Sequence, residues 1–154
     1  AEAAEKTGTR TDKDRELSAR GKKDAARIGS YLADSGDLPQ VIFCSTAIRA
    51  RQTIMLALEK IARDRITIHY EEELYEATQE NVADFIRRID DKFDRAMLVG
   101  HNPAFSAVSR NLSPRSPDHI AAGGLVVITF SSTSWEEVNS ASAESTQYVQ
   151  PQTE

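Results

Sequence analysis

The stretch VIFCSTAIRARQT, residues 41–53, indicates the fold class. Its first part, Val41–Ser45, is a short apolar run with β-branched residues that follows Pro39, and this pattern is typical of a buried strand. A helix is predicted to begin directly after the strand, with Ser45 or Thr46 as its N-cap. The apolar stripe expected to face the core consists of Ile48, Met55, Leu58 and Ala62. A buried strand that leads straight into an amphipathic helix predicts an α/β domain.

The same alternation continues on both sides of this stretch. A helix is predicted before it, over residues 17–36, with Ser18 as a cap and Gly36 at its end. Further helices are predicted after Thr78 and after Asn102. Further strands are predicted at residues 66–70, 96–100 and 125–130 and, antiparallel at an edge near the C-terminus, at residues 145–151. Alternating strands and helices predict a mainly parallel sheet with helices on both faces.

Composition and charge narrow the classes of protein. A chain of 154 residues predicts a single domain over residues 1–154 that is large enough to bury a core. The net charge of −5, without a polybasic patch, argues against a nucleic-acid or membrane partner. No apolar run approaches the roughly 20 residues that cross a bilayer. The single cysteine, Cys44, excludes an internal disulfide and fits a reducing compartment, so we expect a cytoplasmic protein.

Two segments are predicted to meet where such sheets bind ligands, outside the carboxyl ends of the strands. They are CSTAIRARQT after the strand at Val41 and GHNP after the strand at Ala96, and each runs into a helix start that attracts anions. Arg49 lies in the first turn of its helix, where a cation is ordinarily disfavoured. His101 lies at the other helix start. Considered singly, Arg49 is explained as a solvent-exposed helix charge and His101 as a turn histidine. Together, the two residues predict a phosphate pocket.

Other catalytic schemes fit the sequence less well. A cysteine-phosphatase loop needs an arginine at the position that Ala50 occupies relative to Cys44. The sequence contains no G-x-S-x-G elbow, no Walker A loop and no G-x-G-x-x-G motif. Its histidines lack metal-motif spacing, and we expect His69 to have a packing or surface role and His119 to be exposed. No metal and no cofactor are therefore predicted.

Four segments resemble a known family in their order along the chain. They are LSARGKKDAARIGSYL, FCSTAIRARQT, ELYEA and LVGHNP, and they resemble the histidine phosphatase superfamily, in particular its SixA-like phosphohistidine phosphatase branch. The resemblance covers residues 14 to about 151. It implies a metal-independent phosphohydrolase that works through a phosphorylated histidine on the enzyme. Its substrate would be phosphohistidine in a protein or a small phosphoester, and a phosphate-like anion would bind in the pocket.

The resemblance also implies roles for individual residues. Arg49 matches the arginine that holds the phosphate, and His101 matches a second histidine that binds phosphoryl oxygens, with Asn102 beside it. Glu76, in LYEA, is the best positional match for a proton donor. Fixed cationic donors stabilise the charge that a transferring phosphoryl group spreads over its oxygens. We therefore expect His101 to grip phosphate as an imidazolium and not to be the nucleophile.

The sequence departs from the family at its beginning. In the family the nucleophilic histidine belongs to an Arg-His pair at the end of a first strand, and this chain opens at the polar loop that follows such a pair. We expect the pair and its strand upstream of Ala1, with the strand beside those at Val41 and Ala96, so that the chain is N-terminally incomplete. The alternative is a natural remnant without catalysis. The rival function is accordingly a non-catalytic phosphate-binding or protein-interaction module that lacks the nucleophile.

Overall fold

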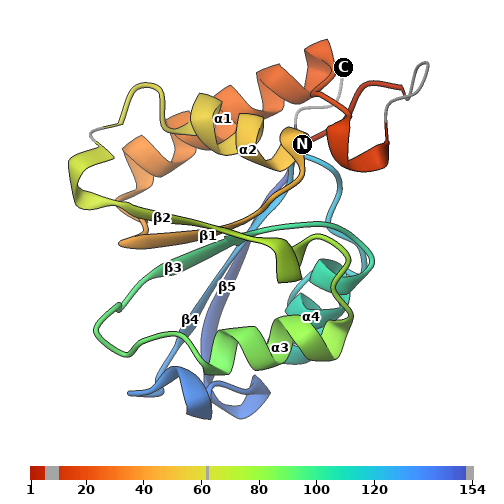
Figure 1. The fold of residues 1–154 in the computed structure, drawn as a ribbon. Helices are drawn as coiled ribbons and strands as arrows, with labels where there is room; N and C mark the ends of the chain where they lie inside the picture. Colours follow the sequence, from red (N-terminus) through yellow and green to blue (C-terminus); the bar gives the residue numbers. More distant parts are fainter. Residues whose placement is uncertain (6–10, 62, 152–154) are drawn as a thin grey trace.

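The helices cover both faces of a small parallel sheet. The computed structural model describes residues 1–5, 11–61 and 63–151. Helices α1 (Ala19–Ser35) and α2 (Ile48–Ala57) lie on one face, and α3 (Gln79–Arg87) and α4 (Ala104–Leu112) lie on the other (Figure 1). Ser18 accepts a hydrogen bond from the Gly21 backbone at the start of α1, as predicted, and Gly36 ends that helix at a φ of 76°. The predicted α/β fold with helices on both faces is confirmed.

The parallel sheet has β1 (Val41–Ser45) in its centre. It pairs with β2 (Thr67–Glu71) on one edge and with β3 (Ala96–Val99) on the other, in the order β2-β1-β3. Because both edges and both faces of β1 are covered, an almost continuous apolar sequence is stable there. Parallel pairing also brings the carboxyl ends of β1 and β3 to the same side of the sheet.

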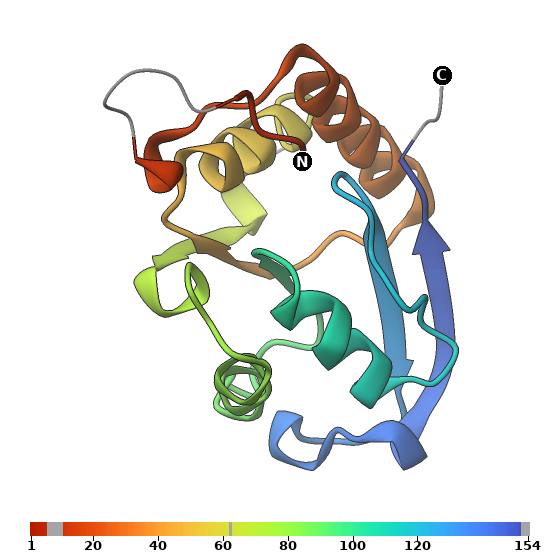
Figure 2. The same ribbon diagram turned by 90° about the vertical axis from the view of Figure 1, so that its right-hand side faces the viewer.

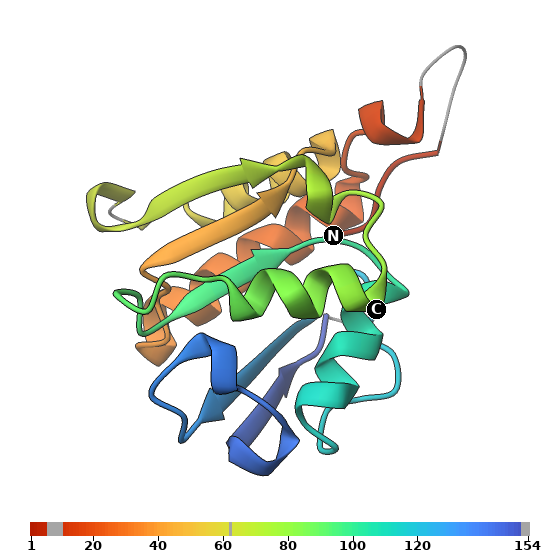
Figure 3. The same cartoon turned by 60° about the horizontal axis from the view of Figure 1, so that its bottom comes forward.

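The chain ends in a separate antiparallel pair. Strands β4 (Leu125–Phe130) and β5 (Ala143–Val149) pair with each other in a two-stranded sheet, which Figure 3 shows beside the parallel sheet. The predicted antiparallel strand near the C-terminus is thus confirmed. Short 3-10 helices lie at Asp12–Asp14 (η1), Arg63–Arg65 (η2), Glu72–Leu74 (η3), Trp135–Glu137 (η4) and Ser140–Ser142 (η5). No helix within the described ranges has both the length and the apolar character needed to cross a membrane.

Two apolar clusters fill the space on either side of β1. Ile42 and Cys44 pack with Ile54 of α2 on one face. Phe43 points to the other face, where its ring meets that of Phe85 edge-on, with centroids 4.9 Å apart. This alternation along one strand joins the two helical layers to the sheet and holds its carboxyl end in place.

Helix α2 buries a different face from the one that the sequence predicted. Met55, which was expected in the core, is 55% exposed, whereas the neighbouring Ile54 is 1% exposed. Ile54 packs against Ile42 and Cys44 of β1, and α1 lies so close to α2 that a side chain at Gly29 would overlap the carbonyl oxygen of Ala57. The buried residues of α2 are Ala50, Thr53, Ile54 and Ala57. Of the other predicted stripe residues, Leu58 is buried, Ile48 is partly buried, and Ala62 lies outside the described residues.

A cleft separates the second edge of β3 from β4. Its larger cavity, of about 580 Å³, is lined by β3, β4 and α4, and a further cavity of about 360 Å³ continues it toward Trp135. Ala1 lines the larger cavity together with Gly123, and Figure 2 shows the N-terminus near the turn before β4. The expectation that an additional first strand would pair with the Val41 strand is wrong, because β2 and β3 take both edges of β1.

The register of α2 leads to a stability prediction. Ile54→Ala should lower the free energy of unfolding by about 2–5 kcal/mol, since it leaves a cavity in the core. Met55→Ala should change it by less than about 0.5 kcal/mol, as expected for an exposed site. Urea unfolding followed by circular dichroism measures both values. A larger loss for Met55→Ala than for Ile54→Ala would contradict this packing.

Candidate functional site

Arg49 and His101 meet at the carboxyl ends of β1 and β3. Arg49 lies in the first turn of α2, just beyond β1, and His101 follows the end of β3. Arg49 Nη2 is 3.4 Å from His101 Nδ1, and only 15% of the arginine side chain is exposed. The predicted juxtaposition of the two residues is confirmed, and its cause is the parallel pairing of their strands.

Ser45 fixes the imidazole of His101 from the other side. Its hydroxyl lies 2.8 Å from His101 Nε2 and is fully buried at the last position of β1. Arginine is only a donor, so the Arg49 contact makes Nδ1 the acceptor and leaves the ring proton on Nε2, which donates to Ser45. The Ser45 hydroxyl also accepts from the Ala47 backbone at 3.2 Å. Both ring nitrogens are therefore engaged, and sequence reasoning had treated Ser45 only as a possible helix cap.

His101 is neutral near pH 7 in this arrangement. Burial, followed by the positive charge of Arg49, lowers the pKa of His101 to about 4. The expected imidazolium concerns His101 with phosphate bound, and it stays a prediction. A dianion beside the ring would favour the charged form and raise this pKa.

Asn102 holds the loop that carries His101. Its Oδ1 accepts from the Ser106 backbone at 3.1 Å and from the Ser106 hydroxyl at 2.6 Å, and its Nδ2 donates to the Ile120 carbonyl at 2.7 Å. The side chain thus holds the first turn of α4, which follows Asn102 as predicted, although Pro103 is the residue directly before the helix. Its contact with phosphate stays a prediction.

The carboxylate of Asp12 completes the site and was missed from the sequence. Arg49 donates through Nη1 to the Asp12 carbonyl at 2.9 Å and through Nη2 to Oδ2 at 3.2 Å. Arg15 Nη1 donates to Oδ1 at 3.0 Å, and the Tyr75 hydroxyl donates to Oδ2 at 2.8 Å. The hydrogen bond from Tyr75, together with those from Arg15 and Arg49, lowers the pKa of Asp12 to about 2. Asp12 lies in a polar segment without a recognisable motif, so the sequence did not predict this role.

The LYEA segment contributes Tyr75 to the site, whereas Glu76 lies outside it. The Tyr75 ring meets that of His101 edge-on, with centroids 5.6 Å apart. Burial and the Asp12 carboxylate raise the pKa of Tyr75 to about 12. Glu76 is exposed and lines a neighbouring hollow together with Tyr75, whereas Arg49 and His101 line another cavity. Its role as proton donor stays a prediction.

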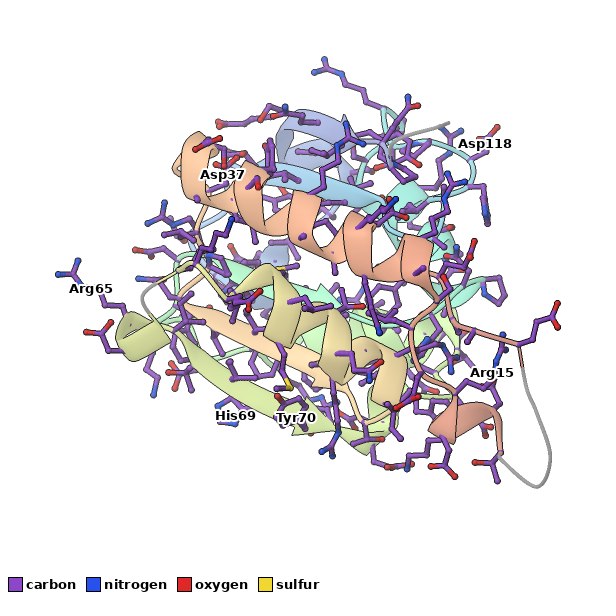
Figure 4. The ribbon with its side chains drawn as sticks, turned by 90° about the horizontal axis from the view of Figure 1, so that it is seen from above. Arg15, Asp37, Arg65, His69, Tyr70 and Asp118 are labelled. Carbon is purple, nitrogen blue, oxygen red and sulfur yellow. The ribbon has the colours of Figure 1, made fainter. Side chains whose placement is uncertain are left out.

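The remaining candidate side chains lie elsewhere. His69 stacks on Phe43, with centroids 5.6 Å apart, and Figure 4 shows it along β2 with Tyr70, away from Arg15. His119 is exposed, as expected. Cys44 is buried, and this burial raises its pKa to about 12. Within the described part of the chain, no three His, Cys, Asp or Glu residues are grouped closely enough to hold a metal ion.

A known family matches the first half of the chain. The model of the histidine phosphatase superfamily (branch 1) matches residues 1–79, just over half of the chain, and this range includes Asp12, Arg49 and Tyr75. The chain belongs to the histidine phosphatase superfamily. His101 lies beyond the matched range, and its place in the site comes from the fold.

Relatives and solved structures extend the comparison over the chain. An uncharacterised protein of Mycobacterium leprae is 32% identical over 111 residues, which are 72% of this chain and 66% of that protein. The chain therefore spans slightly less than two thirds of this relative. A structure from Agrobacterium tumefaciens, assigned as a phosphohistidine phosphatase SixA, is 27% identical and covers 98% of this chain and 93% of its own at a TM-score of 0.78. A second structure, from Nakamurella multipartitia, is also assigned as a phosphohistidine phosphatase SixA. It is 26% identical, and the match covers 97% of this chain and 92% of that chain at a TM-score of 0.78.

The low pKa of His101 predicts how stability depends on pH. The unfolded chain takes up a proton on His101 below about pH 6.5, whereas the folded chain does so only near pH 4. Acidification from pH 6.5 to pH 4 therefore lowers the free energy of unfolding. Above about pH 6.5, His101 is neutral in both states and causes no such loss. The melting temperature should fall between pH 7 and pH 5 by less in His101→Gln than in the unaltered chain. Equal falls in the two proteins would contradict the assigned neutral imidazole.

Proposed function

We propose that this protein is a phosphohydrolase in which Arg49 and His101 bind the phosphoryl group that is transferred. The observation that carries the proposal is the contact between the Arg49 guanidinium and the His101 imidazole at the carboxyl ends of two adjacent parallel strands. A transferring phosphoryl group spreads negative charge over its equatorial oxygens. Donors held rigidly by packed elements stabilise that charge without reorganisation, which is the largest contribution in many enzymes.

The nucleophile in this proposal is a histidine other than His101. Both ring nitrogens of His101 are engaged, by Arg49 and Ser45. The cleft between β3 and β4 has the apolar lining and the open strand edges that suit a further strand. Its end, at Ala1, adjoins the cavity wall formed by Arg49 and His101. A strand that fills the cleft and ends in an Arg-His pair would bring an imidazole to the phosphorus.

The reaction follows from these positions. The imidazole nitrogen attacks phosphorus while the bond to the leaving nitrogen or oxygen breaks, and a proton passes to the leaving atom. Water then attacks the phosphohistidine, releases inorganic phosphate and restores the free histidine. Arg49 and His101 hold the equatorial oxygens in both steps. A leaving imidazole of phosphohistidine needs less help from an acid than an alkoxide does, so Glu76 should matter more for a phosphoester than for phosphohistidine.

Phosphohistidine in a protein, or a small phosphoester, is the proposed substrate. Two features support it: the membership of the superfamily, and the likeness to structures assigned as phosphohistidine phosphatases. Arg49 also contacts η1, none of whose residues is buried, so the arginine lies near the surface, where a phosphoryl group attached to a protein could approach it.

A non-catalytic phosphate-binding or protein-interaction module is the second candidate. One observation favours it: within the described ranges, the only histidine that lines the cavity is His101, with both nitrogens engaged. Such a module would bind phosphate-like anions through Arg49 and His101 without releasing phosphate. The two candidates therefore agree on binding and differ on turnover.

Extension of the chain separates the two candidates. A version extended at Ala1 by an apolar strand that ends in Arg-His should hydrolyse phosphohistidine and retain phosphate covalently on that histidine after acid-free quenching. A matched version that ends in Arg-Asn should bind the substrate without turnover. Phosphate release and intact-mass measurements test both versions. If the Arg-His version neither turns over nor retains phosphate, the binding module is the better account.

Substitutions in the extended chain test the phosphate-binding residues. Arg49→Ala and His101→Ala should each lower kcat by roughly 10²–10³, the scale of one lost transition-state donor. Arg51→Ala is the matched control on the same helix. The Arg51 guanidinium lies over the Tyr70 ring, and its Nε donates to the Thr46 carbonyl. The kcat of Arg51→Ala should therefore change by less than about twofold. An equal loss in Arg51→Ala and Arg49→Ala would contradict a specific role for Arg49.

Metal independence is part of the proposal and has its own test. The phosphoryl charge is to be balanced by Arg49 and His101, so an excess of EDTA should leave the rate of the extended chain unchanged. The rate is measured before and after dialysis against the chelator. Loss of activity that a divalent ion restores would show that the chemistry needs a metal.

A further inference from the structure

The Asp12 carboxylate sits where the donors of three segments converge. It accepts from the Tyr75 hydroxyl, from Arg49 Nη2 and from Arg15 Nη1, at 2.8, 3.2 and 3.0 Å. Two guanidinium groups and a phenol around one carboxylate form a charge-assisted donor set, and the guanidinium of Arg49 is the donor that also suits a phosphoryl group. The donors come from distant parts of the sequence, so the fold assembles this arrangement.

Asp12 takes the N–H groups of Arg49 that an anion needs. Nη1 donates to the Asp12 carbonyl, and Nη2 is shared between Asp12 Oδ2 and His101 Nδ1. Arginine recognises phosphate through two parallel N–H groups of its planar fork. An oxyanion placed between Arg49 and His101 would therefore compete for Nη2, to which the Asp12 carboxylate is bound. The carboxylate charge would also repel a dianion at this distance.

We propose that Asp12 is a built-in competitor of the phosphoryl group: its carboxylate binds Arg49 and is displaced when an anion binds. This proposal rests on the proposed function of Arg49 and His101. The Asp12 side chain is 49% exposed, on the short helix η1, so it turns to water when it leaves Arg49. Asp12 thereby sets the affinity of the pocket and keeps Arg49 ordered between ligands.

The same contact has another interpretation with the opposite consequence. If Asp12 served only to position Arg49 for the anion, removal of its charge would loosen the guanidinium and weaken binding. If Asp12 competes, removal of its charge frees Nη2 and strengthens binding. The sign of the change in affinity therefore decides between the two roles.

Titration calorimetry with tungstate at pH 7.5 and low salt measures that sign on the unaltered chain and its variants. Asp12→Asn should bind tungstate about three- to tenfold more tightly, on the scale of a lost ion pair with its hydrogen bond. Tyr75→Phe keeps the ring against His101 and the net charge but removes one donor to Asp12, so it should tighten binding by a smaller factor. Asp14→Asn is the matched control, because Asp14 lies in the same turn and accepts from Thr11. Its affinity should stay within about twofold of the unaltered chain.

Several results would overturn the proposal. Unchanged or weaker binding by Asp12→Asn contradicts competition, as does an equal gain in Asp14→Asn, which would show a mere effect of net charge. Tyr75→Phe keeps the test valid if Asp12→Asn folds poorly, because weaker binding in Tyr75→Phe also contradicts competition. Arg49→Ala distinguishes a failure of the underlying function. If Arg49→Ala binds tungstate as tightly as the unaltered chain, the proposed phosphate pocket itself is wrong.

Discussion

The parallel pairing of β1 with β3 is the constraint on which the site depends. It places Arg49, at the start of α2, and His101, before α4, at one edge of the sheet although they are far apart in the sequence. Helices on both faces hold the two strands in register through apolar clusters around Ile42 and Phe43. The geometry of the pocket is therefore as rigid as the core beneath it, which a site for a developing phosphoryl charge requires.

Electrostatics then determine how the pocket receives an anion. Burial and the neighbouring Arg49 keep His101 neutral, and the Asp12 carboxylate balances the arginine charge. Arg49, His101 and Asp12 thus each have hydrogen-bond partners within the chain. In the function proposed above, a phosphoryl group would replace Asp12 as the partner of Arg49 and would favour protonation of His101. In this account, binding changes the charge state of the site while the strands keep their positions.

The elements and the pairing of Arg49 with His101 followed from local patterns in the sequence. Val41–Ser45 is a strand with the predicted bounds, and the caps at Ser18 and Thr78 use local hydrogen bonds that short motifs encode. The buried face of α2 was not predictable in the same way. Ile54 and Met55 are both apolar, and the packing of α2 against β1, which is a tertiary contact, decides which one is buried.

Asp12 and Tyr75 also escaped prediction, because their roles arise from tertiary contacts and neither lies in a motif with chemical spacing. The split into a three-stranded and a two-stranded sheet likewise depends on long-range pairing, which periodicity alone does not specify.

The most direct test of the central claim is a crystal structure of the protein soaked with tungstate, with the metal located by its anomalous scattering. The account predicts tungstate oxygens about 2.7–3.2 Å from both Arg49 and His101, with the Asp12 carboxylate turned away from Arg49. Tungstate bound elsewhere, with Arg49 still hydrogen-bonded to Asp12, would contradict the claim that these residues form one phosphate pocket.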